Sequence, residues 1–256
     1  MDLRFAPVEF SEIRNEIIDH LTSLPAAIDS YLEDHILASN HYRIAVGDEP
    51  AGFASIHKGK LITQFALSDA YKRYGQPVFL QLRRMEEVQS AYVPTCDGFY
   101  LAHALDDYRQ LAKQAYFFAA NSGAVAPDSA RSCTLRPADA TDAELIRQHT
   151  GDFFEPLEKH LGAGEIFLTL RGEDTVGFGI IVKSAFFDDV ASIGMFTIEQ
   201  FRGSGVGSAT ISLLARACRD QGLRPIAGCW YYNHLSKKTL EHAGMFSATR
   251  LLKIDY

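Results

Sequence analysis

The sequence has few cysteines and no long hydrophobic run. None of its four cysteines belongs to a Cys-x-x-Cys pair, which argues against a disulfide scaffold or a structural zinc site, so we expect free thiols and no bound metal. No apolar segment approaches the roughly 20 residues of a membrane span, and the first residues lack a basic stretch followed by an apolar one. These absences predict a cytoplasmic protein with no membrane partner.

Positive charge is also scarce. The net charge of −7 over 256 residues disfavours nonspecific binding to nucleic acid, and the length predicts one or two globular domains. The deficit is uneven, because residues 1–130 carry a net charge of −6 and residues 131–256 carry −1. The second half is therefore the better suited of the two to a polyanionic ligand.

Glycines concentrate in one short loop, at positions 202–207. The loop follows the apolar run 193–198 and precedes a segment, from Ser208 to Gln221, with apolar residues at helical spacing. A strand that turns through glycines into a helix leaves backbone N–H groups unpaired at the positive end of the helix dipole, which predicts an anion site. The spacing excludes a P-loop, because no lysine follows Gly207, and fits a dinucleotide-binding turn only in part. A glycine-rich turn without a ligand is the alternative.

The residues after the loop narrow this choice. Gly222 stands where a helix-ending glycine is expected, a short apolar run at 225–232 predicts a strand, and Asn233-x-x-Ser236 begins another helical segment. Loop, helix, strand and Asn-x-x-Ser, in this order, resemble the GNAT superfamily of acyl-CoA N-acyltransferases. Asn233 is equally well placed to act as an ordinary helix N-cap.

The resemblance implies a mixed α/β (α+β) fold with helices on both faces of the sheet and acetyl-CoA as co-substrate. It also implies that two strands splay apart after Thr197 and near Tyr232, and that backbone groups at 195–197 pair with the pantetheine arm. The implied cofactor-binding residues are Met195, Phe196, Thr197, Arg202, Gly203, Ser204, Gly205, Val206, Gly207, Asn233 and Ser236.

The two halves of the chain resemble each other. Three blocks of similar sequence recur in the same order, at offsets of 125 to 132 residues, and the stretch 121–130 between them is rich in turn formers. We predict two GNAT-like domains, 1–121 and 131–256, joined by a linker at 122–130; a coincidental match is the alternative. The first copy should be degenerate. Its loop, Lys72-x-x-Gly75-x-Pro77, contains a proline without an N–H, and aspartates near 104–107 would repel phosphate.

The expected activity is transfer of an acetyl or other short acyl group from CoA to a primary amine of a small molecule or protein. Glu199, just after the loop strand, is the leading candidate for the general base, ahead of Asp188 and Asp189. Many GNAT enzymes carry an acidic tyrosine where this chain has Leu240, so Tyr232, or Tyr231, would have to protonate the thiolate. The alternative is an acyl-CoA-binding sensor or interaction module without turnover.

The sequence says less about the amine that would accept the acyl group. Residues 148–160, which would line its pocket, mix aromatic and acidic side chains, which favours a cationic amine. Whether the chain is a monomer or a homodimer stays open.

Overall fold

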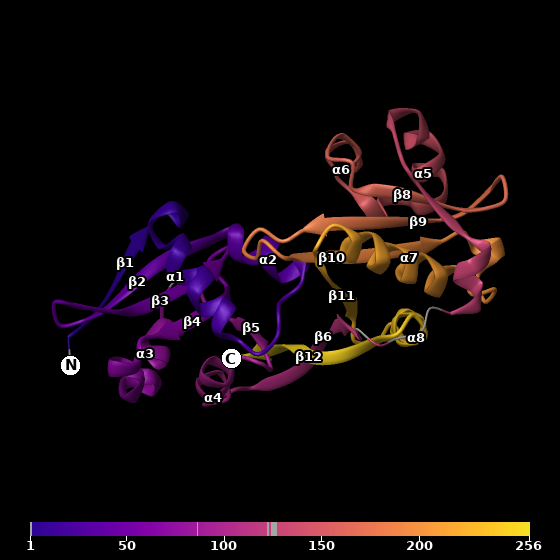
Figure 1. Cartoon of the computed structure of the whole chain (residues 1–256). Coiled ribbons are helices and arrows are strands. Elements are labelled where there is room, and N and C mark those ends of the chain that lie inside the picture. The colour runs from indigo at the N-terminus through magenta and orange to yellow at the C-terminus, as the bar shows by residue number, and fades with distance from the viewer. Residues whose placement is uncertain (1, 86, 122, 124–126) are drawn as a thin grey trace. The chain divides into compact units, whose positions relative to one another are not determined.

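The computed structural model describes residues 2–85, 87–121, 123 and 127–256, which divide into two compact units (Figure 1). Unit 1 comprises Met1–Phe117 together with Thr249–Tyr256, and unit 2 comprises Phe118–Ala248. The last strand of the chain therefore enters unit 1, although the predicted second domain ran from 131 to 256. The predicted linker, 122–130, lies partly outside the described residues.

Unit 1 is built around strands in the order β1-β2-β3-β4-β5-β12-β6. Among the described residues, strands β4 and β5 run parallel and pair at Leu61 with Ser90 and at Ile62 with Ala91. Its elements are β1 (Leu3–Val8), α1 (Phe10–Ser23), α2 (Ser30–Leu37), β2 (Ser39–Val46), β3 (Glu49–His57), β4 (Leu61–Leu67), η1 (Asp69–Tyr74), α3 (Gly75–Leu82), β5 (Ser90–Pro94), α4 (Gly98–Ala104) and β6 (Gln110–Ala120).

Unit 2 repeats this order of elements, with strands arranged β11-β10-β9-β8-β7. Its elements are η2 (Asp128–Ser132), β7 (Thr134–Pro137), η3 (Ala140–Asp142), α5 (Ala143–Thr150), η4 (Gly151–Phe154), α6 (Leu157–Gly162), β8 (Ile166–Arg171), β9 (Asp174–Lys183), β10 (Val190–Thr197), η5 (Glu199–Phe201), α7 (Val206–Asp220), β11 (Arg224–Trp230), α8 (His234–His242) and the start of β12 (Met245–Asp255).

Helices cover both faces of the sheet in unit 2, as predicted. Phe178 packs with Ile146 of α5 and Leu157 of α6 in one apolar cluster. Its neighbour Gly179 points the other way, since a Cβ there would lie 2.8 Å from Leu214 of α7. Adjacent residues of one strand thus contact helices on opposite faces.

Helix α7 confirms the predicted helix and its end. The four residues of its expected apolar stripe are at most 4% exposed. The helix closes in a Schellman motif, in which the N–H of Leu223 donates to Cys218 O and the N–H of Gly222 donates to Arg219 O. Gly222 has φ = 74°, a conformation that glycine adopts without a Cβ penalty. The stripe consists of Ile211, Leu214, Ala215 and Cys218.

The repeat is visible in a pair of equivalent glycines. A Cβ on Gly52 would come within 2.0 Å of Ala66 O, and one on Gly177 within 2.7 Å of Phe196 O. Each glycine therefore lets two neighbouring strands approach at the same place in its unit. The two predicted domains do share one fold.

Candidate cofactor and acyl-transfer site

The glycine loop of unit 2 is an open cradle of backbone N–H groups. Gly203 and Gly205 have φ values of 78° and 81°, and Gly205 is the N-cap of α7. The amides of Val206, Gly207 and Ser208 are the first three of the helix, so they have no intrahelical acceptor. Donors and helix dipole together favour an anion at this point.

Each glycine of the loop has its own reason to lack a side chain. Gly203 faces open space and is set by its φ alone, whereas a Cβ on Gly205 would lie 2.9 Å from Ser129 of η2. A Cβ on Gly207 would lie 3.0 Å from Thr239 and 3.2 Å from the Thr197 hydroxyl. The loop therefore carries no side chain at these three positions, and its backbone N–H groups fit a bulky anionic group such as a pyrophosphate.

The strand before the loop has one unpaired edge. In the described part of the sheet, β10 pairs with β11 only from Val190 to Ser192, while its pairing with β9 continues to Thr197. The two strands therefore separate after Ser192, earlier than the sequence predicted, since the expected point was after Thr197. The separation leaves backbone groups of 193–197 available for an added strand-like ligand.

The predicted residues of β10 lie at this edge and beside the loop. Thr197 Oγ1 and Met195 Sδ both lie next to Gly207. The Phe196 ring packs edge-to-face on Phe153 of η4, with 5.4 Å between ring centroids. Strand end, helix start and η4 thus meet at one place in unit 2.

Asn233 is the N-cap of α8. Its Oδ1 accepts a hydrogen bond from the N–H of Ser236 at 3.0 Å, which confirms the capping alternative. Thr239, one turn after Ser236 on the same helix, is the residue of α8 that approaches Gly207. Sequence reasoning missed Thr239, although its spacing of three from Ser236 could have identified it.

Two arginines contact the loop. Arg202 donates from Nε to Thr197 O at 3.4 Å and lies 5.8 Å from the centre of the Phe196 ring. Arg171, at the end of β8, donates from Nη2 to Ser204 O at 3.4 Å, and its buried Nε has no partner among the described residues. No local feature of the sequence points to Arg171, because only the sheet register brings it to the loop.

The structure does not join the two candidate catalytic residues. Glu199 opens η5 with its side chain 89% exposed, 4.0 Å from Arg202. Tyr232 is half exposed and packs edge-to-face on Trp230. Among the described residues, no hydrogen bond or ring contact connects Glu199 with Tyr232.

The other positions considered for proton transfer are less suited to it. Asp189 forms a two-pronged ion pair with Arg224, at 2.6 and 3.2 Å, and this hydrogen bonding holds the pKa of the Asp189 carboxyl below its usual range. A carboxylate stabilised in this way is a weak base. Leu240 is 4% exposed, so the position that carries a tyrosine in many relatives belongs to the core here.

The equivalent loop of unit 1 is closed. Gly75 has φ = −51°, and η1 leads directly into α3 without a left-handed residue between them. A Cβ on Gly75 would come 2.1 Å from Nε2 of His103, so the His103 ring packs directly against the start of α3. The loop of unit 1 therefore offers no comparable cradle.

The residue of unit 1 that corresponds to Asn233 is Asp97, the N-cap of α4. It accepts from the N–H of Tyr100 at 3.0 Å, and its other oxygen lies 2.8 Å from His20 Nε2. The prediction that aspartates near 104–107 occupy this place was wrong, because those residues follow α4 instead of starting it. A carboxylate is nevertheless present, at Asp97.

In the part of the chain that the structure describes, no group of His, Cys, Asp or Glu is placed to hold a metal ion, and no helix is long and apolar enough to cross a bilayer. All four cysteines are free.

Comparisons with known proteins agree with this geometry. Residues 9–121 match a family model described as an acetyltransferase (GNAT) domain, and residues 134–245 match the acetyltransferase (GNAT) family. No curated protein matches the sequence.

Similar solved structures support the fold along the whole chain. A GNAT-family acetyltransferase from Colwellia psychrerythraea is 16% identical over 100% of both chains, with a TM-score of 0.85. A GCN5-related N-acetyltransferase from Sphaerobacter thermophilus is 13% identical, covers 99% of this chain and 95% of its own, and has a TM-score of 0.66. A tandem GNAT protein from the clavulanic acid biosynthesis pathway is 12% identical, covers 100% and 98%, and has a TM-score of 0.62. The chain belongs to the GNAT acetyltransferase superfamily and carries two GNAT domains in tandem.

Proposed function

We propose that the chain transfers an acetyl or other short acyl group from CoA to a primary amine, and that unit 2 alone performs the reaction. The observation that carries this proposal is the open loop at 202–207 beside the unpaired edge of β10. The loop amides could bind a polyanion, and the edge of β10 could pair with an extended pantetheine arm. In unit 1, by contrast, His103 packs against the equivalent loop.

The binding roles follow from the contacts. Amides of the loop, with Arg202 and Arg171 beside it, would hold the pyrophosphate of acetyl-CoA. The edge of β10 that β11 leaves unpaired at Met195, Phe196 and Thr197 would pair with the pantetheine arm. Asn233 and Ser236 would flank that arm from the start of α8, with the Asn233 amide nitrogen as a donor while Oδ1 caps the helix.

The bound thioester supplies an activated acyl carbon. The neutral amine nitrogen would attack that carbon, so that a C–N bond forms, the C–S bond breaks, and the sulfur leaves as a thiolate that then takes up a proton. A backbone N–H on the free edge of β10 would stabilise the oxyanion. Glu199, acting through water because it is so exposed, would take the amine proton, and Tyr232 would protonate the thiolate. A thiol with a pKa of about 8.5 leaves readily, so weak acid assistance is sufficient.

A non-catalytic acyl-CoA sensor is the second candidate. The exposure of Glu199 and the burial of Leu240 favour it, because neither position provides a preorganised proton donor or acceptor. Binding of acetyl-CoA is therefore better supported than turnover.

The acceptor would enter beside η4, where Phe153 is 56% exposed and meets Phe196. Two acidic residues that suggested a cationic acceptor, Glu155 and Glu158, are paired with Arg147. The preference for a cationic amine therefore depends on Asp152 and on the negative charge of the first half. We propose a small-molecule or peptide amine as acceptor, in the cytoplasm, with the protein a monomer or homodimer.

One assay separates the two candidates. The chain is incubated with acetyl-CoA and a panel of primary amines, free thiol is followed with a colorimetric disulfide reagent, and acetyl-CoA binding is measured in parallel by calorimetry. The enzyme hypothesis expects thiol release that depends on at least one amine. Binding without amine-dependent release would favour the sensor, and no binding at all would overturn both.

A further inference from the structure

Unit 1 contains a row of buried polar side chains across three neighbouring strands. His41 of β2 lies opposite Ser55 of β3, which lies opposite Gln64 of β4. The three residues are at most 4% exposed. His41 Nδ1 lies 2.9 Å from Ser55 Oγ, which donates to Gln64 Oε1 at 3.1 Å.

The fold does not require this row. With Gly52 aligned to Gly177, the corresponding strand positions of unit 2 are Ile166, Ile180 and Gly194, which lie opposite one another in the same way. Unit 2 therefore uses aliphatic residues and a glycine where unit 1 uses three hydrogen-bonding side chains. Burying polar groups is unfavourable unless each finds a partner, so an apolar row would stabilise unit 1 better.

The hydrogen bonds fix which nitrogen of His41 is protonated. With the Gln64 amide oriented as in the structure, Ser55 donates its only proton to Gln64 Oε1, so the Ser55 oxygen accepts from the N–H at Nδ1 of His41. Nε2 then carries a lone pair. It is buried and has no partner among the described residues, and burial lowers the pKa of His41, which keeps the ring neutral.

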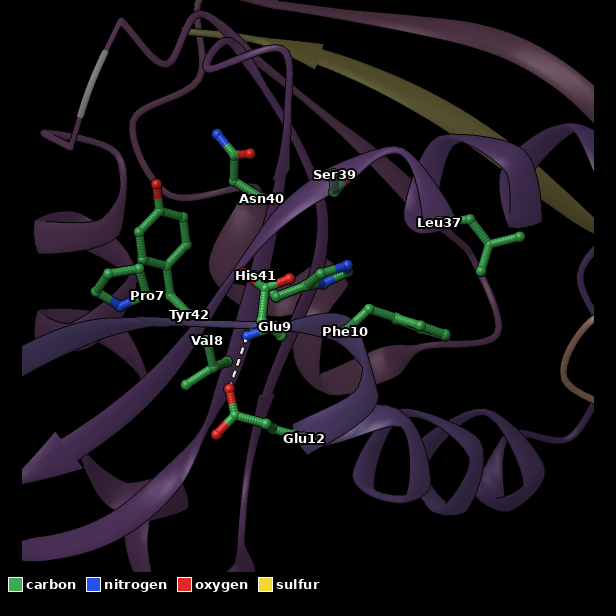
Figure 2. A pocket seen from close by; sticks show the side chains of 10 residues that line it. All are labelled: Pro7, Val8, Glu9, Phe10, Glu12, Leu37, Ser39, Asn40, His41 and Tyr42. Carbon is green, nitrogen blue, oxygen red and sulfur yellow. Dashed lines mark hydrogen bonds between the residues drawn. The ribbon is translucent and has the colours of Figure 1, made fainter.

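His41 is one of the residues that line a pocket of about 610 Å³ (Figure 2). Since Nδ1 points along the sheet toward β3, Nε2 points away from β3, toward the side where β1 meets α1 and the pocket lies. The lining side chains are Pro7, Val8, Glu9, Phe10, Glu12, Leu37, Ser39, Asn40, His41 and Tyr42.

The lining selects the charge and shape of a ligand. It includes two carboxylates, Glu9 and Glu12, and no lysine or arginine. The N–H of Glu9 donates to Glu12 Oε2 at 2.9 Å, which holds the second carboxylate at the rim. The Phe10 ring packs against His41, with 5.5 Å between ring centroids.

We infer that unit 1 binds a small organic ammonium ion in this pocket. Its N–H group donates to His41 Nε2, its positive charge is stabilised by Glu9 and Glu12, and its apolar body lies against Phe10. The site is separate from the acyl-transfer site proposed for unit 2, so either proposal can fail without the other.

The most direct test is NMR of the imidazole nitrogens in the full-length protein, with 2-phenylethylammonium as the probe. The free protein should show the Nε2 resonance of His41 at the position of an unprotonated nitrogen. Saturating probe should shift this resonance toward that of a hydrogen-bonded acceptor, whereas the neutral analogue 2-phenylethanol at equal concentration should bind at least tenfold more weakly. An Nε2 signal that the ammonium leaves unchanged would overturn the inference.

Variants test the assignment of each group. Replacing both rim carboxylates, Glu9→Gln with Glu12→Gln, should weaken probe binding about tenfold or more, whereas Asp19→Asn, which neutralises an exposed carboxylate of the same helix outside the pocket, should leave it within twofold. Ser55→Ala removes the group that fixes the His41 tautomer, so the Nε2 resonance should move even without probe. Equal effects of the rim and control variants would contradict the site, and folding of each variant is checked by its NMR spectrum.

Discussion

The two units share a strand order and differ in where each buries or exposes its polar groups. In unit 2 the loop before α7 presents backbone amides, and the helix-covered face beneath α5 and α6 is apolar. In unit 1 His103 packs against the loop, and a polar row crosses the corresponding face. Two copies of one fold can therefore share a strand register while only one presents an open loop and the other buries a polar row.

The loops of the two units differ first in backbone conformation and then in the hydrogen-bond donors that they offer. Gly205 takes the left-handed conformation that turns the chain into α7, whereas Gly75 is helical, so η1 and α3 form a continuous path. Pro77 then fills the position that corresponds to Gly207 and cannot donate a hydrogen bond. The left-handed conformation of Gly205 therefore distinguishes the open loop of unit 2 from the closed loop of unit 1.

The largest expected effect comes from placing a carboxylate in the open loop. Ser204 is exposed and does not need a glycine conformation, so Ser204→Glu adds charge without backbone strain. We expect acetyl-CoA affinity measured by calorimetry to fall at least 100-fold, or about 3 kcal/mol. Gly98→Glu, the matched change at the exposed start of α4 with open space around it, should leave affinity unchanged. Similar affinities in both variants would contradict the assignment of the loop.

The equivalent glycines Gly52 and Gly177 allow a stability comparison. A Cβ at Gly52 would overlap Ala66 O at 2.0 Å, and one at Gly177 would press on Phe196 O at 2.7 Å. We expect Gly52→Ala to reduce the free energy of unfolding by about 3 kcal/mol, and Gly177→Ala by about 1–2 kcal/mol. Urea denaturation followed by circular dichroism measures both, and a larger loss for Gly177→Ala would contradict the aligned strand register.

Asp29, the buried N-cap of α2, makes unit 1 sensitive to pH. Burial raises its pKa to about 7 from 3.8, so its contribution to stability is fully present below pH 3.8 and is lost as pH rises through 7. Asp29→Asn keeps an N-cap acceptor for the N–H of Leu32 but does not ionise. The variant should therefore gain stability relative to the wild type between pH 5 and 8.5, by denaturant titration. A constant difference across this range would argue against a buried, titrating carboxyl.

The smallest expected effect is at Tyr232. Its side chain is half exposed and would assist only the departure of a good leaving group. For an active enzyme, Tyr232→Phe should lower kcat less than tenfold and leave acetyl-CoA affinity unchanged, while Tyr231→Phe tests the alternative acid. A loss of 100-fold or more would show that Tyr232 is a far stronger acid than its exposure suggests.

The sequence predicted what short-range rules determine. The loop glycines, the apolar stripe of α7 with its terminal Gly222, and the N-cap at Asn233 were all readable because each depends on residues within a few positions. The burial of Leu240 and the point where β10 leaves β11 were not, since tertiary packing decides both.

The polar row of unit 1 was also beyond the sequence. His41, Ser55 and Gln64 come from three strands, and only their register brings them together. A shift of one residue in any strand would point its side chain to the opposite face. Arg171 reaches the loop of unit 2 for the same reason, so both features needed a structure.

The stoichiometry of acetyl-CoA binding tests most directly whether unit 2 alone holds a working cofactor site. Calorimetric titration of the full chain should give one acetyl-CoA per chain, and Ser204→Glu should remove that binding. Two acetyl-CoA molecules per chain, or one that persists in Ser204→Glu, would show that the loop of unit 1 opens and would contradict the account.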